Sequence, residues 1–237
     1  MYQTHKTYIT PEMKMADLIL ENHSLLMLLE HFEIDFTVGD KSVGQICKEN
    51  NIPPSVFLLI ANLYNQFYPN KDNALTCEDI PSIILFLRNS HRYYTQDIYP
   101  EIKASINQLH QHHHTDDIKL IEKFFDSYFR EVLEHLNYEE KVAFPYFCQL
   151  TASGDAQQSL NFSGNHYKDH HSDIETKLSD LKNLMLKHIH LKGDFATRRK
   201  FLKNLFELEF DLNIHSTIEE TVLLPLITQI ENERLNG

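Results

Sequence analysis

The sequence predicts an all-α protein: an up-down-up-down four-helix bundle preceded by a small N-terminal helical domain. Two observations favour helices. The 237 residues include only six glycines and eight prolines, and no stretch alternates apolar and polar residues between hairpin turns. Apolar residues instead recur every three or four positions over four long segments. A third observation favours a bundle: short polar segments join these four helical patterns, which is typical of antiparallel neighbours.

The elements follow in order along the chain. The N-terminal domain is expected over residues 1–70, and the polar segment 68–81 separates it from a bundle over residues 80–234. Polar breaks at HQHHHTDD, at 151–164 and at 190–197 divide the bundle into helices at about 81–110, 116–149, 165–189 and 196–234. At a rise of about 1.5 Å per residue, each of these helices is roughly 35 to 55 Å long.

Composition excludes several classes of protein. The formal net charge is −12, and Lys and Arg look scattered, so nucleic acid is not an expected partner. The apolar runs are too short to span a bilayer, and MYQTHKTYITPEMK lacks a signal-peptide core, so no membrane association is expected. Cys47, Cys77 and Cys148 are widely spaced without a CxxC pair. This spacing suits a reducing compartment, and we expect a cytoplasmic protein.

The front segment SVGQICKENNIPPSVFLLIANLYN has the rhythm of a helix-turn-helix. Its second helix, PPSVFLLIANLYNQ, offers neither Lys nor Arg and is heavily apolar. A helix that reads DNA needs donors for phosphates and base edges. We therefore interpret this region as a packed helical accessory domain.

One thirteen-residue segment occurs twice. HLNYEEKVAFPYF at residues 135–147 returns as HSTIEETVLLPLI at residues 215–227, with five letters in the same places: His, Glu, Glu, Val and Pro. The matched positions are 80 residues apart, which indicates a duplicated helical hairpin. Pro145 and Pro225 lack the N–H of a regular helix, so we expect each to bend or cap its helix.

Each copy directs a His and a Glu toward the expected core. In the first copy the stripe that should face inward includes Val132, His135, Glu139, Val142 and Tyr146; in the second it includes Leu212, His215, Glu219, Val222 and Leu226. Because residues four apart share one helix face, His135 with Glu139 and His215 with Glu219 can reach one small volume. On the other two helices, His91 and His171 interrupt similar apolar stripes.

A regular spacing favours a metal site over packed core histidines. A lone inward His is usually a hydrogen-bonded core residue, and HxxxE arises readily by chance. Here His91 to His135 and His171 to His215 are both 44 residues, and each His recurs after 80. Buried, uncompensated carboxylates would cost several kcal/mol each, and a cation resolves that cost. The predicted ligands are His91, His135, Glu139, His171, His215 and Glu219.

Four imidazoles and two carboxylates suit a pair of first-row metal ions. We expect two iron ions with two His each, both Glu residues bridging, and room for a bridging oxygen and a small exogenous molecule; manganese and zinc also fit this donor set. Several neighbours have two interpretations. Glu175 and His170 are candidate extra ligands or solvated side chains, Glu140 and Glu220 are hydrogen-bond partners or solvated, and His110 with His112, His113 and His114 form a polar turn that would bind metal only adventitiously. Tyr94 and Tyr128 are core packing residues or hydrogen-bond donors near the site.

These residues resemble a known family. His91, HxxxE at 135–139, His171 and HxxxE at 215–219 look like the hemerythrin-like HHE domain, and specifically like the four-His, two-Glu di-iron site of the repair-of-iron-centres (RIC) proteins. SHRYYTQDIYPEI and DHHSDIETKLSDL are similar to the first and third helices of that family, so the resemblance covers residues 80–230. The oxygen-carrying hemerythrins differ, because they use five His with HxxxH on the third helix and HxxxxD on the fourth.

The resemblance extends to the front of the chain. MADLILENHSLLMLLEHFEIDFTVGDKSVGQIC is similar to the small N-terminal domain of RIC proteins, in which a Cys-Cys pair follows the equivalent of Ile34-Asp35-Phe36. Thr37 and Val38 stand at those positions here. The thiol chemistry of that pair cannot occur at this place, and Cys47 is a single thiol that we expect in the core.

The resemblance implies a function. It implies a cytoplasmic non-haem di-iron protein of the nitrosative or oxidative stress response, which repairs iron-sulfur clusters by delivering iron, reduces nitric oxide, or both. Its partners would be NO, O₂ or peroxide, iron-sulfur proteins and an electron donor. The alternative is a module that senses or stores O₂, NO or iron without turnover, and a third interpretation is a metal-free bundle. The sequence identifies no catalytic residue and does not decide between a monomer and a homodimer.

Overall fold

The computed structural model describes residues 7–68, 75–113, 115–151 and 174–236. Within these ranges the secondary structure is helical, with no strand beyond one isolated bridge between Lys14 and Ser42. The predicted all-α class is confirmed. Among the helices of the described ranges, none is long and apolar enough to cross a membrane.

The chain divides into two compact units. Unit 1 comprises Met1–Ser90, Tyr146–Ser159 and Ile214–Gly237, and unit 2 comprises His91–Pro145 and Leu160–Asn213. This division follows spatial contacts and does not test the predicted domains at 1–70 and 80–234, which stay a prediction.

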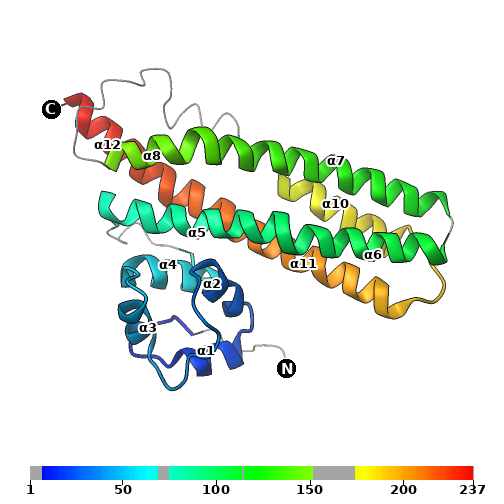
Figure 1. Ribbon diagram of the computed structural model, residues 1–237, viewed down its shortest axis with the longest axis horizontal. Coiled ribbons are helices and arrows are strands. Elements are labelled where there is room, and N and C mark those ends of the chain that lie inside the picture. Colours follow the sequence, from blue (N-terminus) through cyan, green and yellow to red (C-terminus); the bar gives the residue numbers. More distant parts are fainter. Residues whose placement is uncertain (1–6, 69–74, 114, 152–173, 237) are drawn as a thin grey trace. The chain divides into compact units, whose positions relative to one another are not determined.

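The first part of unit 1 is a cluster of four short helices: α1 (Met15–Glu21), α2 (Leu25–His31), α3 (Val43–Glu49) and α4 (Pro54–Tyr64), shown in blue to cyan in Figure 1. A capping box begins α3, because Ser42 accepts from the Gln45 N–H while the Gln45 side chain accepts from the Ser42 N–H. The Phe32 ring contacts Phe57 of α4 and Phe86 of α5 (Ile80–Tyr93). The start of α5 is therefore packed into the same core.

The segment from Asp35 to Cys47 offers no exposed thiol. Val38 is buried, and Thr37 is exposed with its N–H donating to the Asp35 side chain. Cys47 is fully buried in α3, and this burial raises its pKa to about 11. The expectation that Cys47 is a core residue is confirmed.

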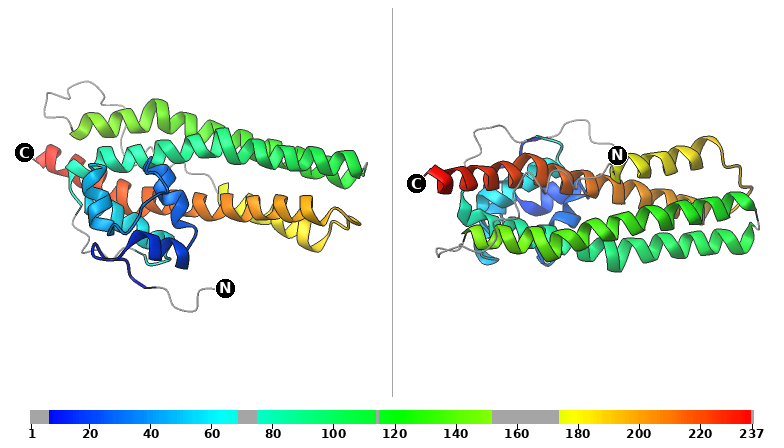
Figure 2. Two further views of the ribbon diagram at one scale, coloured as in Figure 1. Left: turned by 60° about the horizontal axis from the view of Figure 1, so that its bottom comes forward. Right: turned by 90° about the horizontal axis from the view of Figure 1, so that it is seen from above.

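The described part of unit 2 includes helices that lie side by side in all three views: α6 (Tyr99–His112), α7 (Asp116–Tyr138), α10 (Ile174–Lys187) and the unit 2 part of α11 (Phe195–Ile218) (Figures 1 and 2). Stacked rings join α6 to α7, with 3.7 Å between the centroids of Tyr99 and Phe129. A buried hydrogen bond of 2.8 Å runs from the Tyr94 hydroxyl to Asp211 of α11. Tyr94 is therefore a hydrogen-bond donor as well as a core residue.

Candidate metal centre

The two copies of the repeated segment adopt the same backbone. In each, an α-helix gives way to a five-residue π-helical turn that begins at the motif's first Glu: η3 (Glu139–Ala143) after α7, and η4 (Glu219–Leu223) after α11. An α-helix then resumes as α8 (Phe144–Thr151) and α12 (Leu224–Asn236). A third π turn, η2 (Tyr94–Ile98), lies between α5 and α6. Such turns are frequent at functional sites.

A proline follows each of these π turns. The residue before it donates its N–H to a carbonyl five residues back: Tyr99 to Tyr94, Phe144 to Glu139, and Leu224 to Glu219. Pro100, Pro145 and Pro225 come next, where a missing N–H and a bulky ring disfavour the regular i→i−4 pattern. The expected cap is wrong, since the chain continues as a helix beyond each proline. The wider turn accommodates the proline instead.

The valine of the repeated motif lies differently in the two copies. After Glu139, the buried residues include Ala143, Phe144, Phe147 and Leu150, whereas Val142 is 40% exposed. The inward position predicted for Val142 is therefore wrong, whereas Val222, at the same place in the second π turn, is buried as predicted. The π turn, which both copies share, does not account for this difference. Glu139 itself keeps the predicted orientation and is fully buried.

The Glu139 carboxylate contacts two imidazoles through its two different oxygens. Its Oε1 lies 3.0 Å from His135 Nε2, and its Oε2 lies 3.2 Å from His91 Nε2. Burial alone would raise the pKa of Glu139, but the hydrogen bonds to His135 and His91 and their charges hold that pKa well below its usual range. An ionised carboxylate that spans two nitrogen donors has the geometry of a bridging ligand.

The second copy provides a similar pair. Glu219 is fully buried, and its Oε1 lies 3.2 Å from His215 Nε2. The other ring nitrogen of His215, Nδ1, lies 2.8 Å from the hydroxyl oxygen of Ser90, a buried residue of α5. This contact fixes the ring with Nε2 toward Glu219. Sequence reasoning missed Ser90; the only available signal was its place directly before His91.

His91 is oriented in a comparable way. Its Nδ1 lies 3.0 Å from Glu140 Oε1, and its ring stacks on Phe144 with 5.5 Å between centroids. Of the two interpretations of Glu140, the hydrogen-bond partner is confirmed. Glu220, its counterpart in the second copy, is exposed.

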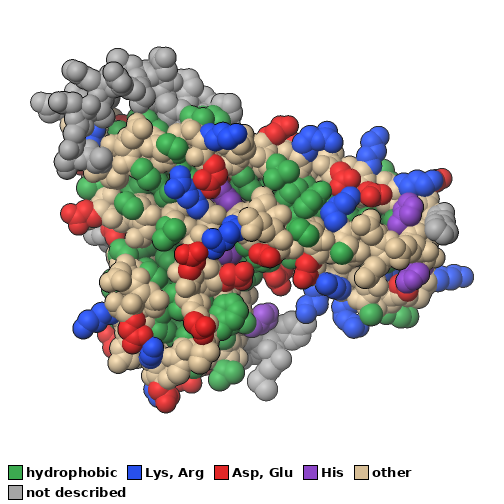
Figure 3. Space-filling model, viewed as in Figure 1, with side chains coloured by type: hydrophobic (Ala, Val, Ile, Leu, Met, Phe, Trp, Pro, Cys, Tyr) green, Lys and Arg blue, Asp and Glu red, His purple; other side chains and the backbone are tan. Residues whose placement is uncertain are grey.

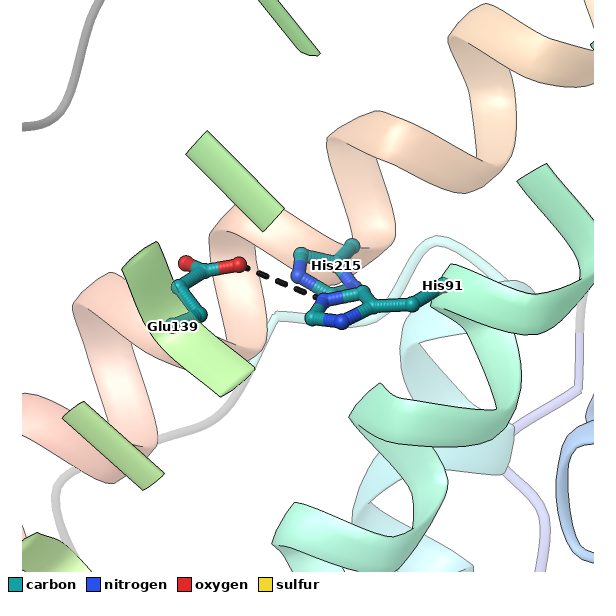
Figure 4. Close-up of side chains that lie close together, drawn as sticks. All are labelled: His91, Glu139 and His215. Atoms are coloured by element: carbon teal, nitrogen blue, oxygen red, sulfur yellow. Dashed lines mark ion pairs between the residues drawn. The ribbon is translucent and has the colours of Figure 1, made fainter. Parts of the chain in front are cut away.

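Two groups of these side chains could hold a metal ion. His91, Glu139 and His215 offer ligand atoms that all lie within 4.8 Å of one another, and so do His135, Glu139 and Glu219. Figure 4 shows the first group, with the ion pair between His91 and Glu139 dashed. Glu139 belongs to both groups, as a bridging residue should, whereas a bridging role for Glu219 stays a prediction.

The donor set and its distances fit first-row metal ions. Two ligand atoms about 2.1 Å from one ion and about 90° apart would be about 3.0 Å from each other. The three His–Glu contacts at 3.0, 3.2 and 3.2 Å lie close to this value. Imidazole nitrogens with carboxylates and no thiolate suit iron, manganese or zinc. The metal-free alternative is a bundle in which these His residues are packed core residues.

Some of the predicted residues are not described by the structure. His171, His170, His114 and the side chain of Glu175 are outside the described residues, so their predicted roles stay predictions. His112 and His113 both contact Asp194 of the α10–α11 connection, at 3.1 and 2.8 Å. They belong to neither metal-binding group. Tyr128 is buried in α7.

Fold and site together define an all-helical protein with buried His and Glu clusters that could hold a metal ion. Comparison with models of known protein families and with curated proteins finds no match.

Proposed function

We propose that this chain is a hemerythrin-like, RIC-type di-iron protein of the nitrosative and oxidative stress response, with an up-down-up-down bundle and a small N-terminal helical domain. Its function is to repair iron-sulfur clusters by iron delivery, to reduce nitric oxide, or both, in the cytoplasm. One observation supports this most strongly. Glu139 is fully buried, and each of its carboxylate oxygens faces the Nε2 of a different His.

The chain's own residues would hold and orient the ligands. Glu139, His91 and His135 form one half of the donor set, and His215 with Glu219 contributes the other. Glu140 and Ser90 contact the Nδ1 atoms of His91 and His215, which leaves Nε2 as the ligand atom in each case. When bound, two iron ions would each supply an electron to a small molecule such as NO, O₂ or peroxide.

The partners follow from this chemistry. Turnover needs an external electron donor, and iron delivery needs an iron-sulfur protein as acceptor. The N-terminal region has Thr37 and Val38 where the resembling family has a Cys-Cys pair, and Cys47 is buried with a raised pKa. Any exchange of iron or electrons would therefore depend on the metal centre and not on a thiol pair at the front of the chain.

The first test is metal content. Protein produced in minimal medium with iron should contain two iron ions per chain and show an absorption spectrum that changes on addition of NO. Manganese and zinc supplied in separate cultures identify the preferred metal. The double variant His112→Ala/His113→Ala should retain the same content, because these residues lie in neither metal-binding group. A content near zero in the wild-type protein would leave only the metal-free bundle.

A second candidate function is sensing or storage without turnover, and the Thr37-Val38 replacement favours it. The two candidates differ under anaerobic NO with a chemical reductant. A reductase accumulates N₂O over many cycles, whereas a sensor forms a stable nitrosyl complex and stops. Gas measurement over a hundredfold excess of NO separates them.

A further inference from the structure

A basic cluster interrupts the acidic character of the chain. Residues 187–203 contain six of the 22 Lys and Arg residues and a single acidic residue, Asp194, in a protein with a formal net charge of −12. The cations of this basic cluster are Lys187, Lys192, Arg198, Arg199, Lys200 and Lys203. The view that Lys and Arg are scattered is therefore wrong for this stretch. In Figure 3 blue side chains gather over the first turns of α11.

A cavity of about 370 Å³ lies within the basic cluster, between the last turn of α10 and the first turns of α11. Its apolar lining is formed by Met185, Leu186, Ile189, Leu191 and Leu202. Met185, Ile189 and Leu191 are buried. Lys187, Lys192, Arg198 and His190 complete the lining. The cavity thus combines an apolar floor with a cationic rim.

The rim cations are placed to receive an anion. Arg198 is held in position, because its Nη1 donates to the Leu191 carbonyl at 2.7 Å and its guanidinium lies 5.9 Å from the centroid of the Phe195 ring. A fixed guanidinium can offer its remaining N–H groups to a carboxylate. Lys187 and Lys192 are exposed, and within the described part of the chain neither forms an ion pair.

We propose that this cavity binds a small amphipathic anion: an aliphatic carboxylate whose head group meets Arg198, Lys187 and Lys192 and whose chain lies on the apolar floor. Its volume is at the lower end of the range for small-molecule sites, about 300 to 1,000 Å³. A purely ionic partner, such as an acidic protein surface, would leave the buried floor of Met185, Ile189 and Leu191 without a role.

This site is independent of the candidate metal centre. Leu202 precedes His215 by 13 residues on α11, which corresponds to roughly 20 Å along a helix. Binding at the cavity can therefore be tested on metal-free protein, and its outcome does not depend on the proposed di-iron function.

Methionine methyl NMR on the full chain provides a direct test. The protein contains five methionines, and Met185 is the one among the described residues that lines the cavity; Met1, Met13, Met15 and Met27 come early in the sequence. Titration of ¹³C-methyl-Met protein with octanoate should shift the Met185 signal in a saturable way and leave the other four unchanged. Octan-1-ol, which lacks the charge, should bind at least tenfold more weakly. No shift of Met185 up to millimolar octanoate, or equal affinity for both probes, would overturn the proposal.

Charge reversal of the rim lysines distinguishes octanoate binding at this cavity from general attraction of an anion to the basic cluster. Lys187→Glu/Lys192→Glu should weaken octanoate binding at least tenfold, because both residues line the cavity. The matched control is Lys200→Glu/Lys203→Glu, which changes net charge equally on the same basic cluster but outside this cavity. Equal weakening by both double variants would contradict a defined site and indicate screening by overall charge.

An anionic membrane surface also offers negative head groups attached to aliphatic chains. Sedimentation with phosphatidylglycerol vesicles and with phosphatidylcholine vesicles distinguishes binding to such a surface from binding of a free carboxylate. Binding of free octanoate with no vesicle binding supports the proposal. Binding to phosphatidylglycerol vesicles without any octanoate shift of Met185 would replace the cavity site with a membrane-surface site and so overturn it.

Discussion

The two copies of the repeated segment, 135–147 and 215–227, share a backbone but differ in their surroundings. Both pass from α-helix to π turn at the motif's first Glu, and both place that Glu at zero exposure. Beyond these matched features they diverge. Glu140 contacts His91 whereas Glu220 is exposed, and Val142 is 40% exposed whereas Val222 is 7% exposed.

The difference shows which properties belong to the motif and which to its neighbours. His, Glu and Pro at fixed spacing set the local backbone and the ligand pair, because those depend on residues within one helix. Contacts to the far side of each imidazole come from other helices, from Ser90 for His215 and from Glu140 for His91. The matched letters Glu140 and Glu220 therefore do not imply matched roles.

The largest effect should come from the two buried carboxylates, and it should be unequal. Glu139→Ala should remove both metal ions, because Glu139 belongs to both metal-binding groups. Glu219→Ala should leave about one ion per chain, because the group of His91, Glu139 and His215 does not include it. Metal analysis after gel filtration measures both. Equal losses in the two variants would show that the copies contribute equivalently and that Glu139 is not the shared ligand.

Removal of an imidazole's outer partner should weaken metal binding without abolishing it. Ser90→Ala should lower affinity by up to about 100-fold, since such partners are worth about 10- to 100-fold and this contact is fully buried. Glu140→Ala should have a smaller effect, because its side chain is 36% exposed and water can replace it. Competition with a chelator of known affinity measures each dissociation constant. A larger loss of metal affinity in Glu140→Ala than in Ser90→Ala would show that the more buried contact does not contribute more to metal binding.

Much of this site could be predicted from local spacing alone. His135, Glu139, His215 and Glu219 follow from i, i+4 geometry within single helices, and His91 from the 44-residue interval. Ser90 could not be predicted, because its contact with His215 joins residues 125 positions apart. The exposure of Val142 could not be predicted either, because its counterpart Val222 has the same local pattern and is buried. His171 lies outside the described residues, so its predicted role is untested.

The matched valines give a third test of how far the copies are equivalent. Val222→Ala should lower the free energy of unfolding by about 2 kcal/mol through lost burial and a small cavity. Val142→Ala should change it by less than about 0.5 kcal/mol, because surface substitutions usually do, and this side chain is 40% exposed. Urea denaturation of metal-free protein measures both without a contribution from bound ions. Similar values would place the two valines in similar environments and contradict the difference in burial between the two copies.

Replacement of the prolines should have the smallest effect on metal affinity. This replacement tests whether the π turn positions the carboxylate. Pro145→Ala restores a backbone N–H and removes the ring clash, so a regular α-helix becomes accessible through Glu139. We expect metal affinity to fall about tenfold, while helicity and thermal stability do not fall, because alanine is favoured over proline inside a helix. Pro225→Ala should act similarly on Glu219.

Pro100 supplies the matched control for this test. It follows the third π turn, η2, which begins with Tyr94 and contains no Glu. Pro100→Ala should therefore leave metal affinity within about twofold, although it relieves the same backbone constraint. Equal losses of metal affinity in all three variants would show that the prolines act on the helices in general and not on the position of the Glu ligands. A loss confined to Pro145→Ala and Pro225→Ala would make the proline a functional part of the repeated motif, which explains why it recurs at the same place in both copies.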